Sequence, residues 1–212
     1  MAKQGSGARN KGSKFERDTA KYLSEWWGYE FHRTPGSGSL HWSSSNNVAG
    51  DIVTPLEANF PYVVECKDHN DEWTLESVVL NQRNIKHWWN QVVDDALSVG
   101  RVPMLIFKRN RSSTFIMLPY NERLDAELAK QQTNFMITYV SYKDMQDREN
   151  RFKVIVFTKE DLKTLGKLFF TTLYPNKNWA DASRATVDYA EEQKAISPSD
   201  YTGIIDDLLS DI

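Results

Sequence analysis

The sequence has little cysteine and no long hydrophobic run, and each shortage excludes a class of protein. Cys66 is the only cysteine among 212 residues, so the chain holds no internal disulfide framework and no cysteine-rich zinc site. Uninterrupted apolar runs are short, such as residues 104–107, whereas a membrane span needs about 20 apolar residues. The first residues contain no apolar core of a secretory signal. We therefore expect a cytoplasmic protein that does not bind membranes.

Several signatures of common enzymes are also missing. The histidines do not follow the spacing of a zinc site; they are His32, His41, His69 and His87. No Walker A motif, dinucleotide-binding glycine pattern or G-x-S-x-G motif occurs. What remains is an ordinary globular composition, with 40% hydrophobic and 26% charged residues.

Charge is unevenly distributed, although the formal net charge is only −3. Residues 1–22 carry six basic and two acidic residues, whereas residues 188–212 carry seven acidic residues and one lysine. A basic segment rich in Gly and Ser is typical of a flexible arm that contacts phosphates, although a solvated leader is the simpler alternative. We interpret residues 1–12 as such an arm. The acidic region 175–212 is interpreted as solvated sequence, with a nucleic-acid mimic or a docking segment for a protein partner as alternatives.

Hydrophobic periodicity predicts an α/β protein. A first helix is expected over residues 14–27, with Ser13 and Glu16 as a capping box at its start and Gly28 at its end. Strands are expected over 29–33, 48–54, 62–67, 102–108, 114–118, 135–140 and 152–157, and further helices over 75–98, 121–130 and 159–173. Thr158 and Asp161 resemble a capping pair for the last helix. Consecutive strands followed by a crossover helix imply a mixed sheet flanked by helices.

The residues that indicate chemistry lie on two neighbouring predicted strands. Glu65 and Lys67 share one face of strand 62–67, because alternate strand residues project to the same side. Asp51 follows Gly50 at the start of an apolar strand, and a hairpin between the two strands would bring Asp51 and Glu65 together. Two converging carboxylates suit a hard cation such as Mg²⁺, and a nearby ammonium suits phosphoryl chemistry. The alternative is an exposed strand with opposite charges two residues apart.

Separated motifs extend this pattern along the chain. They are Lys11-Gly12, Glu16-Arg17, Arg33, Gly36-Ser37-Gly38, Gly50-Asp51-Ile52-Val53, Glu65-Cys66-Lys67 and the apolar segment 102–106. In this order they resemble the archaeal-type Holliday junction resolvases of the PD-(D/E)xK nuclease superfamily. The resemblance covers residues 11–119.

The resemblance implies a restriction-endonuclease-like fold with an αβββαβ core, which agrees with the element order above. It also implies that Asp51, Glu65 and Glu16 bind Mg²⁺, with Mn²⁺ as a substitute, and that Lys67 is the catalytic lysine. DNA contacts are expected from Lys11, Arg17, Arg33 and Ser37. Gln82 is a further candidate because several nucleases of this superfamily carry a glutamine on the following helix, and an exposed helical residue is its alternative reading. Glu16 has the structural alternative of the capping box.

Three functions follow from these observations. The first is a metal-dependent endonuclease that resolves four-way DNA junctions as a homodimer, because a two-fold substrate matches a two-fold enzyme. The second is a restriction-type or repair nuclease that acts on duplex or single-stranded DNA. The third is a non-catalytic DNA-binding protein. We expect the nuclease core at residues 13–119 and a C-terminal α+β extension at residues 120–174, packed on the core and without a counterpart in the compact resolvases.

Overall fold

The computed structural model describes residues 4–35, 46–47, 49–69, 74–79, 83–143, 149–175, 179–180 and 184–185. The first half of the chain contains α1 (Gln4–Trp27), β1 (His32–Arg33), β2 (Asn46–Asn47), β3 (Ile52–Pro55), the short 3₁₀ helix η1 (Leu56–Ala58), β4 (Tyr62–Asp68), α2 (Leu75–Val79) and α3 (Arg83–Ser98). The second half contains β5 (Val102–Lys108), β6 (Phe115–Pro119), α4 (Glu122–Lys130), β7 (Met136–Lys143), β8 (Glu149–Thr158), α5 (Lys159–Leu165), α6 (Lys167–Thr171) and β9 (Arg184–Ala185).

The main sheet is mixed. Its strand order is β4-β5-β6-β8-β7, and β9 pairs with β8. β4 and β5 are parallel, because α2 and α3 carry the chain from one strand back to the start of the next, whereas the later pairs are antiparallel. β1, β3 and β2 form a second, three-stranded sheet. The predicted class, a helix-flanked mixed sheet compatible with the restriction-endonuclease-like fold, is confirmed.

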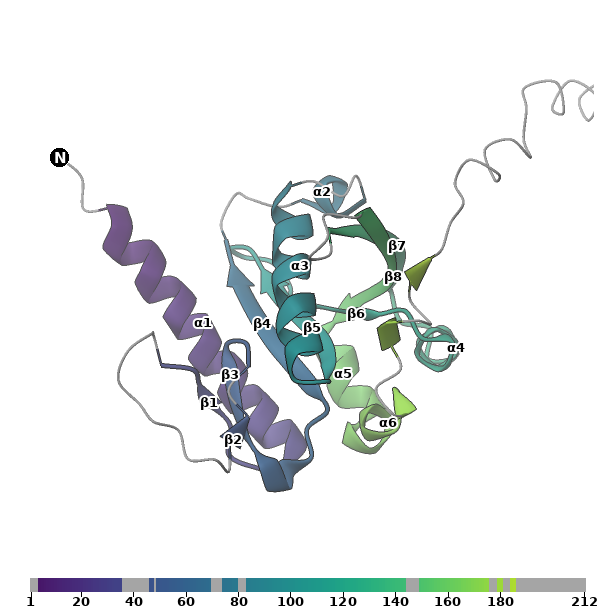
Figure 1. Ribbon diagram of the computed structural model, residues 1–212, viewed down its shortest axis with the longest axis horizontal. Helices are drawn as coiled ribbons and strands as arrows, with labels where there is room; N and C mark the ends of the chain where they lie inside the picture. Colours follow the sequence, from purple (N-terminus) through teal and green to yellow (C-terminus); the bar gives the residue numbers. More distant parts are fainter. Residues whose placement is uncertain are drawn as a thin grey trace, which may run out of the picture.

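Helices cover both faces of the sheet around β4 (Figure 1). Helix α1 packs against β4, and its Thr19 lies within hydrogen-bonding distance of the Cys66 side chain. Helix α3 packs against β4 and β5, and its Gln91 contacts Lys67. Since Cys66 and Lys67 are consecutive strand residues, these contacts place α1 and α3 on opposite faces. Among the described helices, none carries an apolar stretch that could cross a bilayer.

An aromatic cluster fixes α1 to the start of β4. Trp27 and Phe60 are buried, and their ring centroids lie 4.9 Å apart in an edge-to-face arrangement. The indole N–H of Trp27 donates a hydrogen bond of 2.7 Å to the carbonyl oxygen of Ala58, just before β4. The aromatic pair and the buried hydrogen bond therefore both attach the end of α1 to the segment just before β4.

The start of the first helix differs from the prediction. Helix α1 begins at Gln4, so Ser13 lies inside the helix and the predicted capping box with Glu16 is wrong. A Gly or Ser inside a helix costs at most about 1 kcal/mol, which tertiary contacts can offset. Two such contacts are present: the ammonium of Lys11 lies 2.9 Å from the carboxylate of Asp68, and Phe15 is buried.

Other element boundaries also differ from the predictions. The predicted helix 75–98 is described as α2 and α3, with residues 80–82 outside the described part. The predicted helix 159–173 divides at Gly166, whose φ of +74° is incompatible with a continuous helix. The capping box of Thr158 and Asp161 is confirmed. Strand 48–54 shortens to β3, which begins only at Ile52.

Candidate active site

Gly50 brings the chain against the outer edge of β4. Its φ is +73°, and a Cβ atom here would lie 2.5 Å from the carbonyl oxygen of Val64. Only glycine permits both this conformation and this approach without strain. The predicted hairpin is therefore wrong: β3 and β4 are not paired antiparallel, and the described contact is a single parallel bridge between Gly50 and Val64. This bridge places the next residue, Asp51, at the edge of β4.

Asp51 is held by two hydrogen bonds to the backbone of β4. Its N–H donates to the carbonyl oxygen of Val64 at 2.8 Å, and its Oδ2 accepts from the N–H of Cys66 at 2.8 Å. Both β4 groups lie on the side of the strand that bridges to Gly50, and β4 is the end strand of the main sheet in the described part of the chain. The Asp51 carboxylate thus accepts from the Cys66 N–H, a donor that would otherwise pair with a neighbouring strand. This hydrogen bond also holds the carboxylate close to Glu65.

Glu65 and Lys67 lie on the same face of β4, as the strand alternation predicts. The Nζ atom of Lys67 lies 2.6 Å from Oε1 of Glu65. The same Nζ donates to Oε1 of Gln91, on α3, at 3.1 Å. The Glu65 side chain is only 2% exposed and that of Lys67 17%. Lys67 is therefore held between a carboxylate of its own strand and an amide of the helix that covers this face.

The carboxyl groups of Asp51 and Glu65 share one electrostatic environment. Burial, followed by the charge of Asp51, raises the pKa of Glu65 to about 7. Burial also raises the pKa of Asp51, an effect that the Cys66 N–H partly offsets and the charge of Glu16 reinforces. Two neighbouring acids whose pKa values are both raised by burial form a region where an added positive charge is favoured.

Glu16 approaches this region from α1, and its carboxylate pairs with Arg33. Nε of Arg33 donates to Oε2 of Glu16; the Arg33 side chain is 29% exposed and that of Glu16 17%. Among the described residues, no three His, Cys, Asp or Glu side chains are arranged as a metal-binding group. The structure therefore brings together Asp51, Glu65 and Lys67, and places Glu16 next to them in an ion pair.

The remaining predicted residues are dispersed. Lys11 pairs with Asp68 at the end of β4. Arg17 is exposed on α1 and lines a pocket of about 400 Å³ together with Arg33. Ser37 and the glutamine proposed from the sequence, Gln82, lie outside the described residues.

Two residues of α3 were missed by the sequence reasoning. Gln91 contacts Lys67 directly, whereas the prediction for Gln82 stays untested. Asp95 lies one helical turn further along, and burial together with the charge of Asp94 raises the pKa of Asp95. In the sequence, the spacing of four residues places Gln91 and Asp95 on one face of the helix. The spacing does not show which face of α3 meets Lys67, because that depends on how α3 packs against β4.

Comparisons with known proteins identify the family of the chain. A protein-family model described as "Phage putative PDDEXK endonuclease" matches residues 7–171. The chain belongs to this family. It is therefore a nuclease of the PD-(D/E)xK superfamily. The chain is also similar to Protein D14 of Escherichia phage T5, with 30% identity over 115 residues that cover 52% of this chain and 70% of that protein. No solved structure matches the chain.

PD-(D/E)xK nucleases generally depend on a divalent metal ion, and the donor set of this nuclease fits one. Asp51 and Glu65 offer hard carboxylate oxygens, and the buried Glu65 carries a raised pKa. Mg²⁺ is typically held by one or two carboxylates, with waters and substrate phosphates completing its shell. Two acids at the edge of β4 meet that requirement, so the absence of a third ligand in the described group is compatible with a metal site.

Proposed function

We propose that this nuclease is a Mg²⁺-dependent endonuclease that cleaves four-way DNA junctions. Asp51 and Glu65 hold the metal ion, Glu16 is an additional acid of the same site, and Lys67 acts on the phosphodiester. The observation that carries the proposal is the hydrogen bond between Asp51 and Cys66, which aligns one acid with the strand that bears the other acid and the lysine.

Each side chain has a distinct task in this proposal. A bound Mg²⁺ supplies a water of lowered pKa and stabilises charge on the phosphate. Asp51 is oriented before substrate binds, because both of its hydrogen bonds run to β4. Lys67 offers a fixed ammonium to a phosphate oxygen, with Glu65 and Gln91 restricting its position. Arg33, the partner of Glu16, is a cation close enough to Asp51 to lower its pKa, and it contacts the substrate phosphate.

The junction is proposed as substrate because the motif order is similar to that of the junction resolvases. A homodimer with one site per protomer would place two equivalent sites on a two-fold junction, and each site would nick one strand. Lys11, Arg17 and Ser37 are proposed as DNA contacts around this site.

Cleavage of matched substrates tests the proposal. A synthetic four-way junction and a linear duplex of the same sequence are incubated with the full chain, with and without Mg²⁺. We expect Mg²⁺-dependent nicking that favours the junction. Asp51→Asn and Glu65→Gln should lower the rate at least 100-fold, whereas Glu57→Gln, at an exposed residue of η1, should not. Equal or faster cutting of the linear duplex would refute the junction specificity and favour the duplex or single-strand nuclease.

A further inference from the structure

A pocket of about 250 Å³ lies at the last residue of β4, where α1 meets the turn between β5 and β6. Two acidic side chains line it, Asp18 and Asp68. The basic side chains that line it are Lys11, Lys14, Lys108, Arg109 and Arg111. The lining therefore has a formal net charge of +3, in a protein whose overall net charge is −3.

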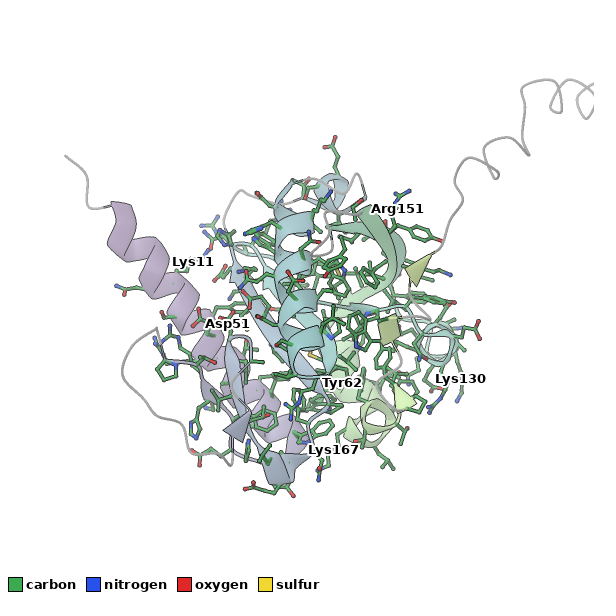
Figure 2. All side chains as sticks on the ribbon, in the orientation of Figure 1. Lys11, Asp51, Tyr62, Lys130, Arg151 and Lys167 are labelled. Atoms are coloured by element: carbon green, nitrogen blue, oxygen red, sulfur yellow. The ribbon has the colours of Figure 1, made fainter. Side chains whose placement is uncertain are left out.

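The pocket borders the end of β4, whose last residue, Asp68, lines it. Asp68 directly follows Lys67 in the strand, and the two side chains point to opposite faces because they are consecutive. Asp68 is paired in register with Lys108 of β5, so the pocket lies at the carboxyl ends of these parallel strands. Ligands of α/β proteins commonly bind at this end of a parallel sheet. Figure 2 shows Lys11 and Asp51 on the same side of the molecule, toward α1.

Internal ion pairs neutralise the acid at the base of this pocket. Asp68 is 4% exposed at its side chain and lies 2.9 Å from the ammonium of Lys11 and 3.7 Å from that of Lys108. The Lys108 ammonium also lies 4.7 Å from the centre of the Phe15 ring. These contacts hold Lys11 and Lys108 in place, and the two ammonium groups offset the negative charge of Asp68.

The rim of the pocket carries exposed cations in an ordered turn. The Ser112 hydroxyl accepts from the N–H of Arg109 at 3.2 Å and donates to its carbonyl oxygen at 3.1 Å. Arg111 is exposed and has a φ of +58°, a conformation that glycine adopts without strain and arginine does not. Lys14 is exposed on the facing side of α1. The turn thus presents a guanidinium at a position where the backbone itself favours glycine.

We infer that this pocket binds a backbone phosphate of the DNA other than the phosphate at which the strand is cut. The inference rests on the proposed function for the location of the cut, and it adds Lys14, Arg109 and Arg111 to the residues that bind substrate. A guanidinium binds phosphate through paired hydrogen bonds, and a lysine contributes a point charge. Such contacts position the duplex without reading its sequence, so the pocket contributes to affinity for junctions and linear duplex alike.

The inference is tested by DNA affinity in a chelator, where no cleavage occurs. Fluorescence anisotropy of a labelled junction and a labelled linear duplex is measured at several salt concentrations for the full chain, Lys14→Gln, Arg111→Gly and the double variant. Each lost phosphate contact should reduce affinity about eightfold at 0.1 M salt and lower the slope of log K against log salt by about 0.9. The double variant should lose about 60-fold on both DNAs.

Two controls make the result decisive. Lys130→Gln removes an exposed cation on the far side of the molecule from Lys11 (Figure 2) and should leave the affinity unchanged. Arg111→Gly relieves the left-handed strain, so its unfolding midpoint in urea should equal or exceed that of the unaltered protein, and weaker binding cannot then result from unfolding. Affinities and salt slopes equal to those of Lys130→Gln would overturn the inference and leave an acidic protein segment as the occupant to examine. If the proposed function is wrong, the cleavage assay shows it, whereas the DNA affinities measured in the chelator do not change.

Discussion

The Asp51 carboxylate and the backbone N–H of Cys66 are joined by a hydrogen bond of 2.8 Å. The same residue donates its own N–H to Val64, so Asp51 is bound to β4 through both its backbone and its side chain. The carboxylate can therefore not rotate freely without leaving a backbone donor unsatisfied. Its direction is determined by the sheet, which prepares the candidate site before any ligand arrives.

Replacing Gly50 tests this dependence on the backbone. Gly50→Ala should destabilise the fold by about 2–4 kcal/mol, because the new Cβ meets the Val64 carbonyl oxygen at 2.5 Å and the φ is positive. Gly100→Ala is the matched control: its φ is +61°, but no atom lies within 4 Å of the new Cβ, so only about 1–2 kcal/mol should be lost. Urea denaturation measures both, and equal losses would contradict the close approach at Gly50.

Metal binding should be visible without catalysis. If Asp51 and Glu65 hold Mg²⁺, the ion stabilises the folded state by about 1.4 kcal/mol at ten times its dissociation constant. Thermal unfolding of the full chain should shift upward with Mg²⁺, and the shift should disappear in Asp51→Asn but persist in Glu57→Gln. A shift of the same size in Asp51→Asn would place the ion elsewhere.

The pH dependence of stability in a chelator reports on Glu65. Its pKa in the folded protein is about 7, above the ordinary value of 4.5, so the folded state binds the proton more tightly than the unfolded state. The stabilisation that this proton provides is complete below about pH 4.5 and is lost as the pH rises to about 7. The difference in unfolding free energy between the unaltered protein and Glu65→Gln should fall over this window by on the order of 1–3 kcal/mol. A difference that stays constant from pH 4.5 to 8 would show that Glu65 does not titrate in this way.

Gln91 should act as a positioning residue for Lys67. Gln91→Ala removes the acceptor that lies 3.1 Å from the lysine Nζ, and the remaining bond to Glu65 leaves the ammonium less restricted. We expect kcat to fall about 10- to 100-fold while the affinity for DNA stays constant. Single-turnover cleavage and anisotropy separate the two effects. Gln131→Ala, at the end of α4, is the control, and a loss of affinity equal to the loss of rate would instead indicate a role in DNA binding.

Local patterns accounted for the elements whose causes are local. Strand alternation placed Glu65 and Lys67 on one face of β4, and the Thr158 capping box was readable because all its atoms belong to neighbouring residues. The predicted Ser13 capping box is wrong for the opposite reason. Helix α1 begins before Ser13, at Gln4, and its Lys11 forms an ion pair with the distant Asp68. A short motif predicts correctly only where no long-range contact competes with it.

The sequence alone supplies the residue types of the proposed site: two acids and a lysine on adjacent segments, with a glycine before the first acid. Tertiary structure decides how they meet. Gly50 joins β4 by a parallel bridge rather than a hairpin, and α3 brings Gln91 to Lys67. Side-chain type and strand periodicity follow from neighbours along the chain, whereas the bridge and the helix contact depend on packing between segments 14 and 24 residues apart, which no local pattern encodes.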